Sequence, residues 1–147
     1  MAETLGSLCD KLTIIKLKQY HSKDEARLLS LKQQQNQIII EIDEFVLDAI
    51  SGLIPIHKLT FQSNKVYKNI SKDIQEINGD IGSIFSKLAE VNCFLWHEQE
   101  KVYEFEKVAV SEKDVVVKQL SILNLERTNC IDKIDAKLVK LIEQLKK

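Results

Sequence analysis

The chain has 147 residues, with 21 Lys plus Arg against 22 Asp plus Glu, so its formal net charge is −1. A hydrophobic share of 44% beside 29% charged residues can build a core, which argues against a disordered or fibrous protein. The near-neutral charge, with Lys spread along the chain, lacks the basic patch that nucleic-acid binding requires. We therefore expect no nucleic-acid partner.

The sequence also lacks membrane and export signals. No apolar run approaches the roughly 20 residues of a membrane-spanning helix, and the first residues lack the basic-then-apolar layout of a signal peptide. Cys9, Cys93 and Cys130 form no Cys-x-x-Cys pair and are typical of reduced, buried thiols. These features predict a cytoplasmic protein without a membrane span.

The first 50 residues are predicted to be helical because apolar residues recur at steps of three and four. The two stripes are Leu5, Leu8, Leu12 and Ile15, then Leu28, Leu31, Gln35, Ile38, Ile42, Phe45 and Ala49. Ser22 followed by Glu25 is a potential capping box, so residues 2–50 form either one helix or two joined by a tight turn. We favour a single helix of about 45 residues.

The centre of the chain carries most of its helix-breaking residues. Ser51-Gly52 ends the first helical region, and Pro55 marks a loop over residues 53–63. A short helix is expected over residues 65–77, capped by Ser63 or Asn64 and ended by Asn78-Gly79.

The second half predicts two more helices. Asp80 caps a helix that runs to about Val108, and Ser111 with Asp114 resembles a second capping box before the last helix. The two apolar stripes are Ile84, Leu88, Val91, Leu95, Glu98, Val102 and Phe105, then Leu120, Leu123, Arg127, Cys130, Ile134, Leu138, Leu141 and Leu145.

No segment shows the period-two alternation of a half-buried strand. We therefore expect an all-α protein, an antiparallel helical bundle of about four helices with two of them long. It forms one domain over residues 1–147, with hairpin-like halves at 1–50 and 80–147 joined by a loop and short helix over 51–79.

Similar motifs occur in the two halves. Tyr20-His21 matches Trp96-His97, and the Ile-x-x-Ile-Asp pattern ending at Asp43 matches the one ending at Asp135. These matches predict two pseudo-repeated helical hairpins, with Gln35 at the position equivalent to Arg127.

The motifs of the second half resemble a bacterial family catalogued as domain of unknown function 4254. The resemblance is carried by Leu88-x-x-x-Asn92-x-x-Leu95-Trp96-His97-Glu98, Lys118, Leu123-Asn124-x-x-Arg127-x-Asn129 and the run from Ile131 to Asp135. In the first half it continues through the run from Leu5 to Ile14 and through Lys18-x-Tyr20-His21. The resemblance implies a small helical bacterial protein, sometimes encoded among glycosyltransferase genes of surface-polysaccharide synthesis, and implies no particular reaction.

Two charged residues interrupt the apolar stripes of the second half. Glu98 and Arg127 are predicted to face each other, because a buried charge is costly without a partner. The pair either fixes the register of the bundle, which we favour, or lines a polar pocket in which Arg127 binds an anion through its planar fork.

The histidines offer a second type of chemistry. His21 and His97 could act as general acid-base groups or metal ligands, although a structural His beside an aromatic residue is more common. Cys93 and His97 share a helical face, yet no further Cys or His stands at a metal-binding spacing. We expect no metal site and no cofactor.

Carboxylates one turn apart allow one further enzymatic reading. Glu41 and Glu44, with Asp132 and Asp135, have the spacing by which helical pyrophosphatases hold Mg²⁺ over a polyphosphate. The same spacing is typical of solvated helix faces, which we favour.

Two functions follow from these patterns. In the favoured one, the protein is a noncatalytic interaction or accessory protein, with a ligand or partner groove lined by Asn92, Trp96, His97, Arg127 and Asn129. Its expected partner is a second copy, another protein or an anionic small molecule. In the alternative, it is a small hydrolase or transferase acting on a phosphorylated or nucleotide-linked substrate, with Arg127 holding the anion and His97 or Glu98 moving protons.

Overall fold

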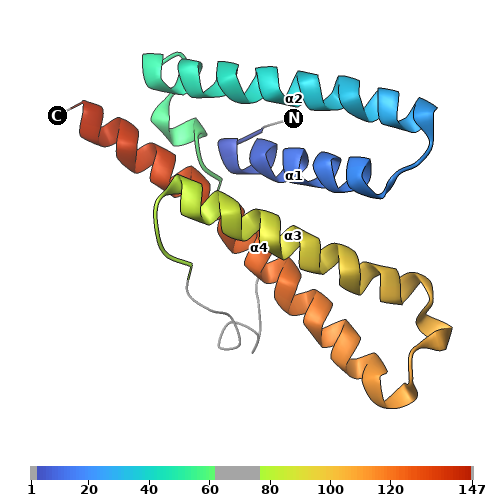
Figure 1. Ribbon diagram of the computed structural model, residues 1–147. Coiled ribbons are helices and arrows are strands. Elements are labelled where there is room, and N and C mark those ends of the chain that lie inside the picture. Colours follow the sequence, from blue (N-terminus) through green and yellow to red (C-terminus); the bar gives the residue numbers. More distant parts are fainter. Residues whose placement is uncertain (1–2, 62–76, 147) are drawn as a thin grey trace.

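The computed structural model describes residues 3–61 and 77–146. Its long elements are four α-helices: α1 (Leu5–His21), α2 (Glu25–Ser51), α3 (Ile81–Tyr103) and α4 (Val110–Leu145) (Figure 1). Two single 3₁₀ turns, η1 (Ile56–Lys58) and η3 (Phe105–Lys107), follow α2 and α3. No strand occurs in the part of the chain that is described, so the predicted all-α helical bundle is confirmed.

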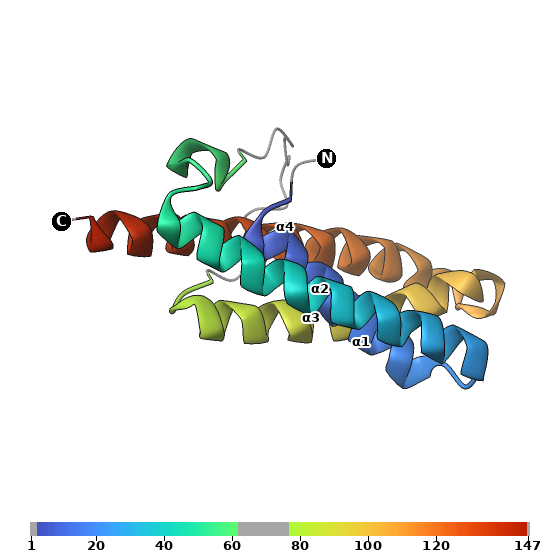
Figure 2. The ribbon, with the colours of Figure 1, turned by 90° about the horizontal axis from the view of Figure 1, so that it is seen from above.

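The helices form two antiparallel hairpins with α1 in the middle. α2 lies along one side of α1, while α3 and α4 pack against each other and against its other side (Figure 1). Seen from above, α2 lies over α1 (Figure 2). Because α1 contacts all three other helices, its side chains are buried in more than one direction.

The prediction of one long helix over residues 2–50 is wrong. The chain turns at residues 22–24, where Ser22 is extended and the side chain of Asp24 accepts a hydrogen bond from Ala26 N at 3.1 Å. The expected capping box of Ser22 and Glu25 is therefore replaced by an Asp24 cap. Folding back lets α1 and α2 bury their apolar stripes against each other, which a single straight helix could not do.

The apolar stripe predicted for α2 is confirmed. Leu31 and Ala49 are buried, and the other five members of the stripe are half-buried. α2 ends at Gly52, whose backbone is left-handed with φ 84°, a conformation that favours glycine. The predicted helix over 65–77 and its Ser63 or Asn64 cap lie almost wholly outside the described residues.

The second hairpin matches its predicted stripes more closely than its predicted ends. Ile84, Leu88 and Val91 are fully buried on α3, whose N-cap is Asp80 as predicted. α3 ends at Tyr103 rather than near Val108, and the 3₁₀ turn η3 follows it.

Two expectations for α4 are wrong. The helix begins at Val110 with Ala109 as N-cap, so Ser111 lies inside the helix and forms no capping box. Near the other end, Leu141 and Leu145 are exposed while Ile142 is buried, because the stripe continues from Leu138 by a step of four. Ile142 thereby joins the core cluster.

The main core lies where the two hairpins meet. Its buried members include Leu5, Cys9, Ala49, Leu59, Ile84, Leu88, Cys130, Ile134, Leu138 and Ile142. Every helix contributes to this cluster, so the hairpins share one core. Within the described ranges, no helix has the length and apolar character needed to cross a membrane.

Candidate functional site

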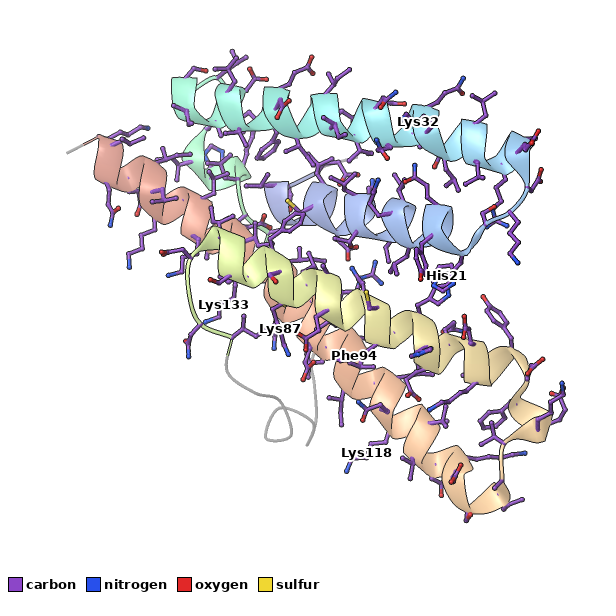
Figure 3. The ribbon with its side chains drawn as sticks, viewed as in Figure 1. His21, Lys32, Lys87, Phe94, Lys118 and Lys133 are labelled. Atoms are coloured by element: carbon purple, nitrogen blue, oxygen red, sulfur yellow. The ribbon has the colours of Figure 1, made fainter. Side chains whose placement is uncertain are left out.

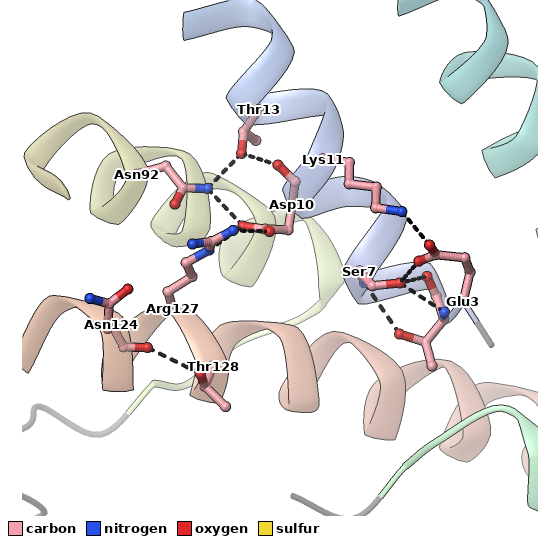
Figure 4. A network of polar contacts seen from close by, with 10 residues as sticks. Glu3, Ser7, Asp10, Lys11, Thr13, Asn92, Asn124, Arg127 and Thr128 are labelled. Atoms are coloured by element: carbon pink, nitrogen blue, oxygen red, sulfur yellow. Dashed lines mark hydrogen bonds and ion pairs between the residues drawn. The ribbon is translucent and has the colours of Figure 1, made fainter. Parts of the chain in front are cut away.

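A polar network joins α1, α3 and α4 beside the core. Arg127 on α4 donates from Nε to Asp10 Oδ1 at 2.8 Å and from Nη2 to Asp10 Oδ2 at 2.6 Å (Figure 4). The hydrogen bonds and charge of Asp10 raise the pKa of the Arg127 guanidinium, so Arg127 is always charged. The predicted partner was wrong: Glu98 instead accepts a hydrogen bond from Lys101 at 3.0 Å on its own helix.

Asn92 on α3 completes this network. Its Nδ2 donates to Asp10 Oδ1 at 3.0 Å and to Thr13 Oγ1 at 2.6 Å, and Thr13 Oγ1 donates to the Asp10 carbonyl at 2.7 Å (Figure 4). Asn92 is fully buried, and its Oδ1 has no hydrogen-bond partner. The network therefore fixes how three helices meet, at the cost of one unsatisfied carbonyl.

Three of the five predicted groove residues, Trp96, His97 and Asn129, lie outside this network. Trp96 donates from Nε1 to Glu100 Oε1 at 3.0 Å, and its ring stacks on His21 with the ring centroids 4.7 Å apart and an interplanar angle of 9°. His21 lies at the end of α1 near α3 (Figure 3). The stack therefore joins the two hairpins at the end of α1.

The remaining predicted residues lie apart. The side chain of His97 is 81% exposed, with Nδ1 3.7 Å from Glu100 Oε2, so it faces solvent beside α3. Asn129 is half-buried on α4, and its side chain makes no hydrogen bond to a described residue. Of the five predicted groove residues, Asn92 and Arg127 share Asp10 as a partner, whereas Trp96 and His97 both approach Glu100 on the exposed side of α3.

A second buried carboxylate holds the start of α1. Asp135 on α4 is buried and accepts a hydrogen bond from Gly6 N at 2.7 Å. Burial raises the pKa of Asp135 to about 6, although the bonds from Gly6 and Thr4 oppose that shift. The two helices approach so closely here that a Cβ on Gly6 would overlap the Ile131 carbonyl oxygen.

Two of the three thiols, those of Cys9 and Cys130, are buried. Burial raises the pKa of Cys9 to about 12 and that of Cys130 to about 11, so both are neutral and unreactive at pH 7. Cys93 is exposed, which corrects the expectation that all three thiols are buried. Within residues 3–61 and 77–146, no three His, Cys, Asp or Glu side chains are arranged to hold a metal ion.

Two clefts flank α1. The first, of about 510 Å³, lies between α1 and α2, and Arg127 reaches it from α4. Its polar lining includes Lys11, Lys18, Gln34, Gln37 and Glu41. The second, of about 320 Å³, lies between α1 and α3 and is mostly apolar, with Leu12, Leu17 and Phe85 in its wall.

Sequence reasoning missed Asp10, which is the centre of the network. The apolar stripe of α1 drew attention to one side of the helix, whereas Gly6, Cys9, Asp10 and Thr13 recur at steps of three and four on another side. Small and short polar residues at helical spacing allow close approach of a second helix. This second stripe of small and short polar residues was the sequence feature that could have indicated a buried role for Asp10.

Comparisons of the chain with protein-family models, with curated proteins and with solved structures find no match. The function is therefore inferred from the geometry described above.

Proposed function

We propose that this protein is a noncatalytic interaction protein that forms a homodimer through the outer face of α2. We define that face by Leu29, Lys32, Ile40, Asp43 and Leu47. The observation that carries the proposal is a line of large apolar side chains pointing to solvent. Leu29 is 63% exposed, Ile40 56% and Leu47 67%.

These three residues lie on one side of the helix. Eleven residues separate Leu29 from Ile40 and seven separate Ile40 from Leu47, which correspond to about three and two turns. The opposite side of α2 packs toward α1, which leaves the outer face uncovered by the other helices (Figure 1). An exposed apolar line along a helix already buried on its other side is typical of an interaction surface.

The charges on the outer face favour a second copy as the partner. Lys32 and Asp43 are both exposed and lie eleven residues apart, hence on the same side of α2, whose Lys32 is labelled in Figure 3. The midpoint of Lys32 and Asp43 lies half a residue before residue 38, which is the midpoint of Leu29 and Leu47. In an antiparallel pair of α2 helices with a twofold axis at that point, Lys32 faces the partner's Asp43 and Leu29 faces the partner's Leu47.

The test is the oligomeric state measured by sedimentation velocity over a range of concentrations. We expect a dimer in the wild type and a monomer in Ile40→Glu. Lys32→Asp and Asp43→Lys should each weaken the dimer about tenfold, because each interface contains two such pairs at about 0.7 kcal/mol each.

The double variant Lys32→Asp/Asp43→Lys should restore the dimer, since it re-forms the pairs with reversed signs. Lys133→Asp on α4 is the matched control, because Lys133 is exposed on a different helix (Figure 3). The proposal is overturned if the wild type stays monomeric at every concentration, or if Ile40→Glu dimerises as strongly as the wild type.

The resemblance to the bacterial family supports a setting beside the glycosyltransferases of surface-polysaccharide synthesis, where a dimer would serve as an accessory protein. The hydrolase or transferase alternative has weaker support. Nε and Nη2 of Arg127 already donate to Asp10, whereas His97 lies beside Glu100 and Glu98 pairs with Lys101.

A further inference from the structure

The cleft between α1 and α2 has opposite charges at its two ends. Lys16 Nζ donates to Gln35 Oε1 at 3.0 Å, which sets the register of the antiparallel pair and places Lys18 near Gln34 at one end. The register places Glu41 near Lys11 at the other end, which is toward the start of α1. The cleft lies on the α1 side of α2, away from the outer face described above.

The charge at each end follows from the pairs already formed. At the Glu41 end, Lys11 pairs with Glu3 and Arg127 pairs with Asp10, which leaves the carboxylate of Glu41 as the uncompensated charge. At the other end, Lys18 has no ion-pair partner in the described part of the chain. A ligand that matches the cleft is therefore positive at one end and negative at the other.

The middle of the cleft offers hydrogen-bond acceptors above an apolar wall. Gln34 Nε2 donates to Ser30 Oγ and Gln37 Nε2 donates to Glu41 Oε1, both at 3.2 Å. The amide oxygens of these two glutamines accept no hydrogen bond from a described residue. Ile14, Ile15 and Ile38 complete the lining.

The length of the cleft limits how far apart the positive and negative groups of a ligand can be. Seven residues of helix separate Lys11 from Lys18, which is about 10 Å along α1. An extended chain spans up to roughly 3.5 Å per residue, so three residues cover the same distance. A peptide also carries N–H donors between its charged termini, which suit the open glutamine oxygens.

We propose that this cleft binds a free peptide of about three residues in extended conformation. Its ammonium group lies against Glu41, its carboxylate lies against Lys18, its backbone N–H groups face Gln34 and Gln37, and an apolar side chain packs on the isoleucines.

The probe is the tripeptide Ala-Val-Ala with free termini, titrated into the full-length protein and followed by ¹H–¹⁵N NMR spectroscopy. We expect a Kd of about 0.1–1 mM, with shift changes at residues 11–18 and 34–41. Lys18→Gln and Glu41→Gln should each weaken binding about two- to fivefold, the range for an exposed ion pair. Acetylation of the peptide's amine or amidation of its carboxylate should weaken binding by a similar factor.

Two controls separate this proposal from the others. Lys140→Gln removes an exposed Lys of α4 outside the cleft lining and should leave the Kd unchanged. Lys32→Asp should weaken the dimer and leave peptide binding intact, so the two proposals fail independently. The proposal is overturned if Ala-Val-Ala does not bind at 10 mM, if both cleft variants bind it as the wild type does, or if the doubly blocked peptide binds equally well.

Discussion

Arg127 and Asp10 are 117 residues apart in sequence, and the Nε and Nη2 atoms of Arg127 each donate a hydrogen bond to one carboxylate oxygen of Asp10. The two partners differ in exposure, because the side chain of Asp10 is 8% exposed and that of Arg127 is 34% exposed. This difference in exposure determines which of the two residues can be substituted with the smaller loss of stability.

We predict that removing Arg127 costs more stability than removing the charge of Asp10. Arg127→Met leaves a buried carboxylate without its cation and should cost about 2–4 kcal/mol, whereas in Asp10→Asn the Arg127 side chain can turn toward solvent. Urea unfolding of the two variants and of the double variant measures both costs. Equal costs would mean that the pair contributes little beyond packing.

The close approach of α1 and α4 at Gly6 predicts a sharp contrast between two glycines. Gly6→Ala should destabilise the fold by about 1–3 kcal/mol, because its Cβ would meet the Ile131 carbonyl and lie 2.9 Å from Asp135 Oδ1. Gly82→Ala near the start of α3 has open space and should be neutral or stabilising by up to about 1 kcal/mol. Thermal unfolding of the two variants gives the comparison, and a Gly6→Ala protein as stable as the wild type would contradict the tight contact.

Asp135 predicts an unusual pH dependence. Its folded-state pKa of about 6 lies above the value of about 3.9 in an unfolded chain, so its proton is held more tightly when the protein is folded. The resulting stability is fully present below about pH 4 and is lost as the pH rises through 6. Asp135→Asn should therefore gain stability relative to the wild type at pH 7 and lose that advantage by pH 4.

The measurement is the free energy of unfolding of both proteins at several pH values between 4 and 7. The difference should change by about 2–3 kcal/mol across this range, provided that the amide introduced by Asp135→Asn keeps the bond from Gly6. A constant difference would show that Asp135 titrates normally in the folded state.

The stack of His21 on Trp96 can be followed by fluorescence, because Trp96 is the single tryptophan of the chain. His21→Ala should uncover one face of the indole, shift its emission to longer wavelength and increase quenching by acrylamide. The expected loss of stability is about 1 kcal/mol or less. His97→Ala, which removes an exposed neighbour on the same helix, should change neither signal.

The helices and most of their buried stripes could be predicted because an amphipathic pattern is local. The tight turn at residues 22–24 was the less favoured alternative because no Gly or Pro marks it; the apolar stripe stops at Ile15 and resumes at Leu28, and Asp24 provides the cap. The partner of Arg127 was missed. Choosing between Glu98 and Asp10 depends on how the hairpins cross, which helical periodicity does not determine.

The central place of α1 makes the order of synthesis important. Gly6 and Asp10 find their partners on α4 only after residues 127–135 have been made, and these bonds span 129 and 117 residues. Until then, the side of α1 that carries Gly6, Cys9 and Thr13 has no α4 to pack against in the nascent chain. The contacts between α1 and α4 therefore form only after the other helices have been synthesised, and until then this side of α1 is exposed to chaperones and proteases.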